Sequence, residues 1–132
     1  MNFKLSTKEK FTELELSEPV LSANMTDEID KMLSECMEKP EKNLVLSLKG
    51  VEEIQAPVAL KLLDWQGRFY EEQQSFVICD INPAIEELWE SEGLLEQLNV
   101  TPTISEAWDI VQMEEIEREL FSDFDEETTW ST

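Results

Sequence analysis

Two short apolar segments, NLVLSL at residues 43–48 and SFVIC at residues 75–79, constrain the fold of this chain more than any other feature. Both are short and rich in residues that favour strands. A helical pattern separates them, and further helical patterns follow. Strands that alternate with helices pair in parallel through right-handed crossovers, and the helices must then cover the sheet. The sequence therefore predicts an α/β fold.

The N-terminal segment FKLSTKEKFTELELSEPV alternates apolar and polar residues on both sides of a polar patch at residues 8–10. A period of two predicts two short, half-buried strands, with Phe11, Leu14 and Leu16 mostly on one face. From Met25 the apolar spacing becomes helical. This change predicts a first helix that ends before Pro40, and its candidate N-caps are Asn24 and Thr26.

The helix between the two apolar segments begins at QAPV, where we expect Ala56 at the N-cap and Pro57 at the first helical position. Alanine is a poor N-cap, and the missing side chain costs typically about 1 kcal/mol. Leu60 falls outside the inward arc of this helix, on the same side as Ala56, Pro57, Asp64 and Gly67. The sequence therefore predicts an uncapped helix start with a small, partly apolar outer face.

Asn82 and Pro83 predict the start of a third helix, and Gly93 predicts its end as a left-handed residue. The residues expected to face inward are Ile85, Leu88 and Trp89. A short extended piece then leads to Thr103 and Glu106, which match the capping box of a fourth helix. The second half of that helix turns other apolar residues outward, so we expect it to protrude or to contact something else. These residues are Met113, Ile116, Leu120 and Phe121.

One domain is expected over residues 1–121, because 132 residues with 41% hydrophobic residues suffice for a single core. An acidic, mobile tail is expected at residues 122–132. Phe121, Phe124 and Trp130 place aromatic residues in or beside this tail, either as a docking segment or incidentally.

The charge is strongly negative and unevenly distributed. The chain has 10 basic and 31 acidic residues, and residues 69–132 hold a single base, Arg118. Such a field repels phosphate backbones and anionic lipids, so we expect neither nucleic-acid binding nor direct membrane contact. It favours a protein partner with a basic surface, although solubility alone also explains it. No apolar run is long enough to cross a bilayer and no signal core is apparent, so a cytoplasmic protein is expected.

Catalytic motifs are missing from the sequence. There is no histidine, which excludes histidine-based triads, and three glycines form no phosphate-cradling loop. Cys36 and Cys79 lack metal-ligand spacing and suit buried, reduced thiols. The many adjacent carboxylates fit a solvated surface better than an acid–base pair. We therefore expect no enzyme activity, no cofactor and no metal.

About residues 43–111 resemble the STAS family, the domain of anti-sigma-factor antagonists and of sulfate-transporter tails, without a gap until just after Leu94. The resemblance is carried by Gly50-Val51 and Ile54, by Leu62-Leu63, by Pro83, Gly93 and Leu94, and by Ser105-Glu106-Ala107 in the last helix. It implies a STAS-like fold with a mixed sheet of about four to five strands and about four helices.

The sequence departs from the family pattern at one place. Where family members have Asp-Ser-Ser-Gly, this chain has Gln55, Ala56, Pro57 and Val58. The resemblance aligns Ala56 with the serine that kinases phosphorylate, and alanine has no hydroxyl. We therefore expect a degenerate phosphoacceptor position, at which the charge of a phosphate cannot switch partners.

These observations lead to two functional hypotheses. The first is a regulatory module that resembles anti-sigma-factor antagonists and binds a protein such as an anti-sigma kinase. The second is a constitutive accessory subunit of a larger complex, such as a lipid-transport ATPase or another enzyme. In both, the expected contact surface is the start of the second helix. Its residues are Gln55, Ala56, Pro57, Leu60, Asp64 and Gly67.

Overall fold

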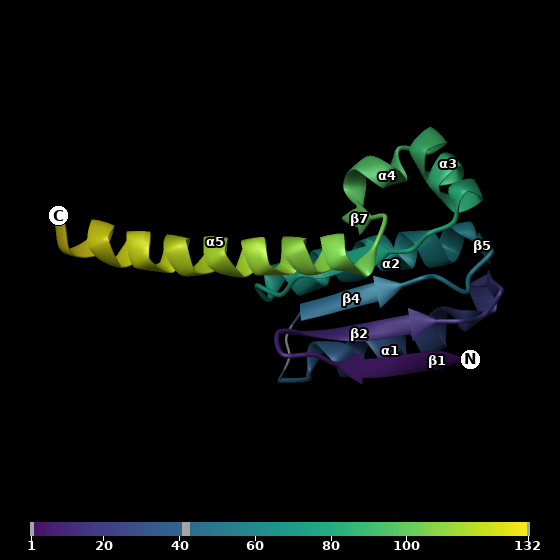
Figure 1. The fold of residues 1–132 in the computed structure, drawn as a ribbon, viewed down its shortest axis with the longest axis horizontal. Helices are drawn as coiled ribbons and strands as arrows, with labels where there is room; N and C mark the ends of the chain where they lie inside the picture. The colour runs from purple at the N-terminus through teal and green to yellow at the C-terminus, as the bar shows by residue number, and fades with distance from the viewer. Residues whose placement is uncertain (1, 41–42, 132) are drawn as a thin grey trace.

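A mixed five-stranded sheet lies between two layers of helices (Figure 1). The computed structural model describes residues 2–40 and 43–131, and the side chains of residues 2–40 and 43–120. In chain order the elements are β1 (Phe3–Thr7), β2 (Phe11–Leu16), β3 (Val20–Leu21), η1 (Ala23–Met25), α1 (Thr26–Met37), β4 (Asn43–Ser47), β5 (Glu53–Ile54), α2 (Ala56–Glu71), β6 (Phe76–Cys79), α3 (Pro83–Ser91), α4 (Leu94–Gln97), β7 (Val100–Thr101) and α5 (Ile104–Ser131).

The strand order is β1-β2-β4-β6-β7. β1 runs antiparallel to β2, and the other neighbours are parallel, with Leu14 opposite Leu46 and Val45 opposite Val77. The predicted α/β fold and mixed sheet are confirmed. A second, two-stranded sheet of β3 and β5 lies before α2, and the sequence did not predict it.

The two faces of the sheet carry separate cores. Every residue of β4 and β6 is buried, as the apolar segments predicted. On one face, Leu46 and Ile78 pack in the main cluster, which also holds buried residues of α1, α2 and α3. On the other, Val45 and Val77 pack with Ala107 and Val111 of α5. α5 thus covers the second face.

Two expectations about the N-terminal half are wrong. Phe11 does not share the face of Leu14 and Leu16, because it lies an odd number of residues away along β2 and packs under α5 instead. The N-cap of α1 is Met25, without a side-chain cap. The turn η1 leads directly into the helix there, so neither candidate cap occupies that position.

α3 begins and ends as predicted. Asn82 accepts a hydrogen bond of 2.8 Å from the backbone of Ile85, and Gly93 has a φ of 77°. Leu88, however, is 49% exposed, whereas Ile85 and Trp89 are buried. The expectation that all three face inward is wrong for Leu88, because α3 buries only the ridge formed by residues four positions apart.

α5 starts after the predicted cap, with Thr103 Oγ1 accepting a hydrogen bond of 3.3 Å from the Glu106 amide. Its C-terminal half extends away from the rest of the molecule (Figure 1). The expected outward residues Met113, Ile116 and Leu120 are exposed. The side chains of Phe121, Phe124 and Trp130 lie outside the described residues, so the docking-segment hypothesis is not tested.

Candidate functional site

The start of α2 lacks a side-chain cap, but the residue at the N-cap differs from the prediction. Gln55 occupies the N-cap with an extended backbone, and Ala56 and Pro57 are the first two helical residues. Proline fits either position of the first turn, so its presence did not fix the boundary. The Gln55 side chain accepts a hydrogen bond of 2.8 Å from the Ala23 amide instead of capping α2.

The six expected contact residues are all exposed at the surface of α2 and its N-cap. They are Gln55, Ala56, Pro57, Leu60, Asp64 and Gly67. We call them the α2 surface. Leu60 is its largest apolar member and is 59% exposed. Because Ala56, Leu60, Asp64 and Gly67 follow one another by three or four residues, they form one stripe along the helix.

A shallow hollow of about 300 Å³ adjoins this surface. α2 contributes Ala56, Leu60 and Leu63 to its walls. The C-cap of α3 contributes Glu92, and α4 contributes Leu94 and Gln97. The hollow therefore combines an apolar floor with a carboxylate at its rim. This combination suits a side chain with an apolar stem and a positive end, such as lysine or arginine.

Three charged residues of α2, Lys61, Asp64 and Arg68, form ion pairs with each other or with α1. Asp64 lies 2.9 Å from Arg68, and the Arg68 guanidinium lies 4.7 Å from the centre of the Trp65 ring. Lys61 lies 3.2 Å from Asp30 of α1. The first turn of α2 has no acidic residue. The start of the helix is thus left to small and apolar residues.

Leu88 is an apolar residue near this region that sequence reasoning did not assign to a surface. Together with Ile54, Ala84 and Ile85 it lines a hollow of about 200 Å³, and Glu52 and Glu53 complete the walls. Its position one residue before Trp89 placed it near the inward arc, which concealed the exposure. Leu88 extends the exposed apolar area on the side of β5 and α3.

Hydroxyl groups are not available at the α2 surface. Residues 50–60 contain no serine, threonine or tyrosine. Ser47 and Ser75, at the strands on either side of α2 in the chain, are buried. The Ser47 hydroxyl donates a hydrogen bond of 2.9 Å to Asp80, and the Ser75 hydroxyl donates one of 2.6 Å to Glu114. Both are therefore occupied in internal contacts.

A polar network joins the middle of α5 to the sheet. The Tyr70 hydroxyl donates to both carboxylate oxygens of Glu114, at 2.7 and 2.8 Å. Arg118 donates to the Ser75 hydroxyl at 2.9 Å and to Asn43 Oδ1 at 3.5 Å. Burial, together with Glu114, raises the pKa of Tyr70 above its ordinary value. The network fixes the rotation of α5, and the sequence analysis did not identify it.

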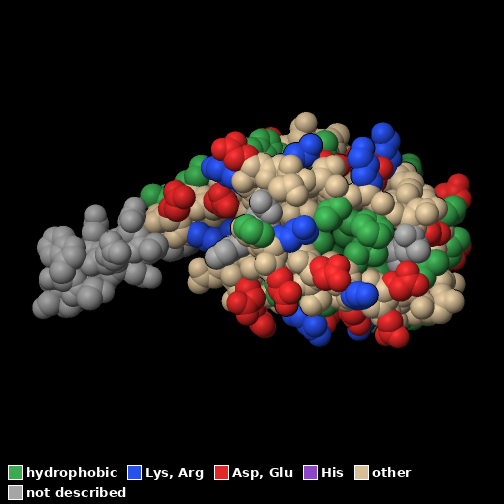
Figure 2. Space-filling view, turned by 90° about the horizontal axis from the view of Figure 1, so that it is seen from below, with side chains coloured by type: hydrophobic (Ala, Val, Ile, Leu, Met, Phe, Trp, Pro, Cys, Tyr) green, Lys and Arg blue, Asp and Glu red, His purple; other side chains and the backbone are tan. Residues whose placement is uncertain are grey.

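A further apolar area lies on the side of β1 and α1, where Figure 2 shows hydrophobic side chains gathered between acidic and basic ones. Phe3 and Met32 line an open hollow of about 320 Å³ there, with Glu28, Lys31 and Glu35 at its edges. Charges of both signs surround this hollow. The area therefore lacks the one-sided charge that would select a partner.

The described residues hold no cluster of acidic, histidine or cysteine side chains that could bind a metal ion. Within the same part of the chain, no helix has the length and apolar character needed to span a bilayer. Cys36 and Cys79 are buried and free, as predicted.

Several solved structures have a fold similar to that of this chain. A putative anti-sigma factor antagonist from Thermotoga maritima has a TM-score of 0.71 at 18% identity, over 83% of this chain and 94% of that chain. The phosphorylated form of the Bacillus cell fate determinant SpoIIAA has a TM-score of 0.60 at 13% identity, over 83% of this chain and 99% of that chain. A murine anion transporter, solute carrier 26 family member A9, has a TM-score of 0.65 at 15% identity, over 79% of this chain and 18% of that chain.

No curated protein sequence matches the chain. The sequence profile of the STAS domain matches residues 2–107, from β1 into the first turn of α5. STAS domains are generally non-catalytic regulatory modules that contact other proteins. Because this profile spans most of the chain, and the fold is similar to that of a solved STAS domain protein, this chain belongs to the STAS domain family.

Proposed function

We propose that this STAS domain is a non-catalytic module that binds a protein partner through the α2 surface. The observation that carries the proposal is the exposure of Leu60, at 59%, beside the hollow formed with Glu92 and Leu94. Isolated exposed leucines are common on protein surfaces. Here the leucine adjoins Ala56 and Leu63 around one concavity, where the apolar stem of a lysine or arginine side chain of the partner can insert.

The proposed partner has a basic surface. Acidic residues lie on both sides of the start of α2, with Glu52 and Glu53 before it and Glu92 at the rim of the hollow. The whole chain has a formal net charge of −21. Such a field accelerates the approach of a basic protein and repels an acidic one.

We further propose that binding at the α2 surface does not depend on phosphorylation there. The family resemblance aligns Ala56 with the phosphorylated serine, and Ala56 offers no hydroxyl. A phosphate on a helix start adds about two negative charges and changes which partner fits. Without an acceptor, the surface keeps one chemical state, which corresponds to an anti-sigma-factor antagonist that is permanently unmodified.

Capture from the source cells, with the full chain as bait and quantitative mass spectrometry as readout, tests the surface. Leu60→Asp should reduce the captured partner strongly. Phe3→Asp is the matched control, because Phe3 is exposed to a similar degree, at 50%, and lies on β1, outside the proposed contact. Equal capture of every protein by the Leu60→Asp variant and the unchanged chain would exclude the α2 surface.

Phosphorylation is tested by incubating the chain with ATP and an extract of the source cells, followed by peptide mapping. We expect no phosphate within residues 50–60. A neighbouring hydroxyl, such as that of Ser22 next to Ala23, could still be phosphorylated. If a phosphate there altered which proteins the unchanged chain captures, the proposal that binding does not depend on phosphorylation would be contradicted.

A constitutive accessory subunit is the second candidate. It is favoured by the structural similarity to a murine anion transporter, in which the matched region is 18% of a longer chain. A constitutive subunit should co-purify in fixed stoichiometry and resist salt, whereas a regulator held mainly by charge should dissociate as the ionic strength rises. Salt washes of the captured complex therefore distinguish the two candidates.

A further inference from the structure

α5 carries an exposed apolar stripe that has no role in the proposed α2 contact. Met113, Ile116 and Leu120 are 61%, 55% and 62% exposed. Their spacing of three and four residues places them on one side of the helix. We call these three residues the α5 stripe. Among the side chains that the structure describes, these three are among the most exposed large hydrophobic residues.

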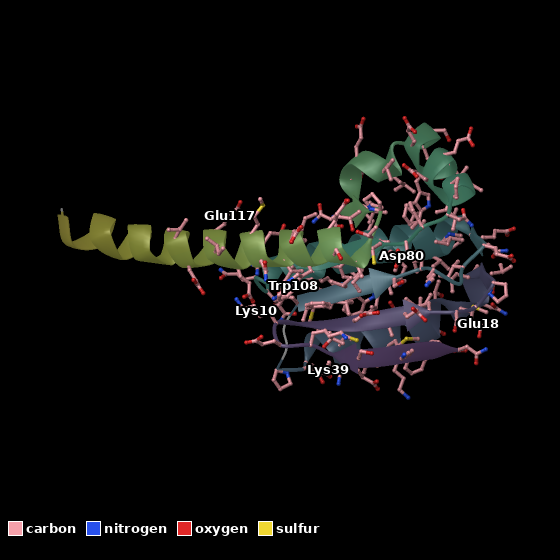
Figure 3. The ribbon with its side chains drawn as sticks, in the orientation of Figure 1. Lys10, Glu18, Lys39, Asp80, Trp108 and Glu117 are labelled. Atoms are coloured by element: carbon pink, nitrogen blue, oxygen red, sulfur yellow. The ribbon has the colours of Figure 1, made fainter. Side chains whose placement is uncertain are left out.

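The stripe faces away from the sheet because the opposite side of α5 is fixed. Ala107 and Val111 are buried against the strands, and Glu114 and Arg118 are held by the polar network with Ser75. In Figure 3, Glu117 lies on the upper side of α5, whereas Trp108 lies on the lower side, toward the strands. Rotating the stripe onto its own sheet would break both sets of contacts.

Carboxylates flank the stripe on both sides. Glu117 and Glu119 are exposed, and neither forms an ion pair with a basic side chain that the structure describes. α5 has ten acidic residues and one basic residue, Arg118, which is engaged with Ser75 and Asn43. The stripe is therefore an apolar ridge within a one-sided negative field.

The spacing of the stripe corresponds to positions a, d and a of a heptad, the pattern by which one helix packs along another. In the same frame Glu117 and Glu119 occupy the flanking e and g positions, where charge selects the partner. A second copy of α5 would bring carboxylates against carboxylates. We propose that the α5 stripe binds an amphipathic helix of another protein whose apolar ridge is flanked by lysine or arginine.

This contact is separate from the α2 surface, so either can fail without the other. A synthetic helical peptide of about three heptads, with leucine at a and d and lysine at e and g, serves as the probe. Its binding to the full chain is measured by fluorescence anisotropy at physiological salt. A peptide with glutamate in place of the lysines is the charge control and should not bind.

Variants that keep the net charge distinguish binding at the α5 stripe from a nonspecific attraction between a basic peptide and an acidic protein. Ile116→Asn combined with Leu120→Asn should weaken binding by roughly tenfold or more, the loss typical of an apolar anchor. Phe3→Asn, at an exposed apolar residue of β1 outside both proposed surfaces, should leave it unchanged. Circular dichroism checks that α5 remains helical in each variant.

Two results would overturn the proposal. Equal affinity of the peptide for the unchanged chain and for the double variant would mean that charge alone attracts it. Dimerisation of the unchanged chain in light scattering, abolished by the double variant, would mean that the stripe binds a second copy.

Discussion

The indole nitrogen of Trp65 donates a hydrogen bond of 2.8 Å to a carboxylate oxygen of Asp30. The other oxygen of Asp30 lies 3.2 Å from Lys61, so one side chain of α1 holds two residues of α2. Both contacts lie on the side of α2 that faces α1. They fix the rotation of the helix, and with it the residues that α2 presents to solvent.

This pair predicts a small acid-dependent loss of stability. The hydrogen bond from Trp65 lowers the pKa of Asp30 below its ordinary value of 3.8. A lowered pKa gives stability that is present above pH 3.8 and is lost as the pH falls through the lower value of the folded protein. Because Asp30 is partly exposed, we expect about 1 kcal/mol or less.

Asp30→Asn should therefore lower the free energy of unfolding near neutral pH, and the difference from the unchanged chain should shrink below the ordinary pKa of the carboxyl. Urea unfolding followed by tryptophan fluorescence, near neutral pH and again below pH 3.8, measures this difference in the free energy of unfolding. A difference that does not depend on pH would show that the charge of Asp30 contributes nothing.

The glycines of α2 and of the α3 end should respond in opposite directions to alanine. Gly93 has a φ of 77°, so Gly93→Ala should destabilise the fold by about 1–2 kcal/mol. A Cβ at Gly67 meets no atom within 4 Å, so Gly67→Ala should stabilise α2 by about 0.5–1 kcal/mol. Thermal unfolding of both variants checks the pair, and a loss at Gly67 would contradict the helix interior assigned to it.

The two thiols should be unreactive in the folded chain. Burial raises the pKa of Cys36 to about 11 and that of Cys79 to about 12. A thiol reagent at mildly alkaline pH should therefore label neither until denaturant unfolds the chain. Because these pKa values are raised in the folded chain, burial of the neutral thiols contributes fully to stability below pH 9.0. This contribution declines as the pH rises toward the pKa values of the folded chain. Rapid labelling of the folded chain would exclude this burial.

The polar network that holds α5 should weaken when the Tyr70 hydroxyl is removed. Tyr70→Phe removes the donor to Glu114 and the acceptor for Asn99, which donates to the Tyr70 hydroxyl at 2.6 Å. Leaving the Asn99 amide and one carboxylate oxygen of Glu114 without this partner should cost about 1–3 kcal/mol, although Ser75 still donates to the other oxygen. Because the pKa of Tyr70 is raised, the unchanged chain should itself lose this stability only under strongly alkaline conditions. Hydrogen exchange of residues 104–120 provides the measurement, and unchanged protection would contradict the network.

Local patterns predicted most of the fold. The buried strands β4 and β6 contain uninterrupted apolar runs, at residues 44–46 and 76–79, and the caps at Asn82 and Thr103 mark helix starts through contacts that span three residues. Such features depend on neighbours in the chain, so they can be recognised in the sequence. The exposure of the α2 surface also followed from a local property, the period of the helix.

The features that the sequence did not predict depend on contacts between residues far apart in the chain. Leu88 is exposed because only the ridge of Ile85 and Trp89 is buried, and periodicity cannot show how wide the buried strip of a helix is. The network of Asn43, Ser75 and Arg118 joins residues up to 75 positions apart. One signal was present, since Arg118 is the single base in residues 69–132.

The dependence of one sheet face on α5 has a consequence for how the protein is made. During translation, α1, α2 and α3 leave the ribosome before α5 does, so the main cluster can form early. Val45 and Val77 stay uncovered until the last helix emerges. A chaperone that recognises exposed apolar surface would therefore find this face of the sheet open, until α5 emerges and packs on Val45 and Val77.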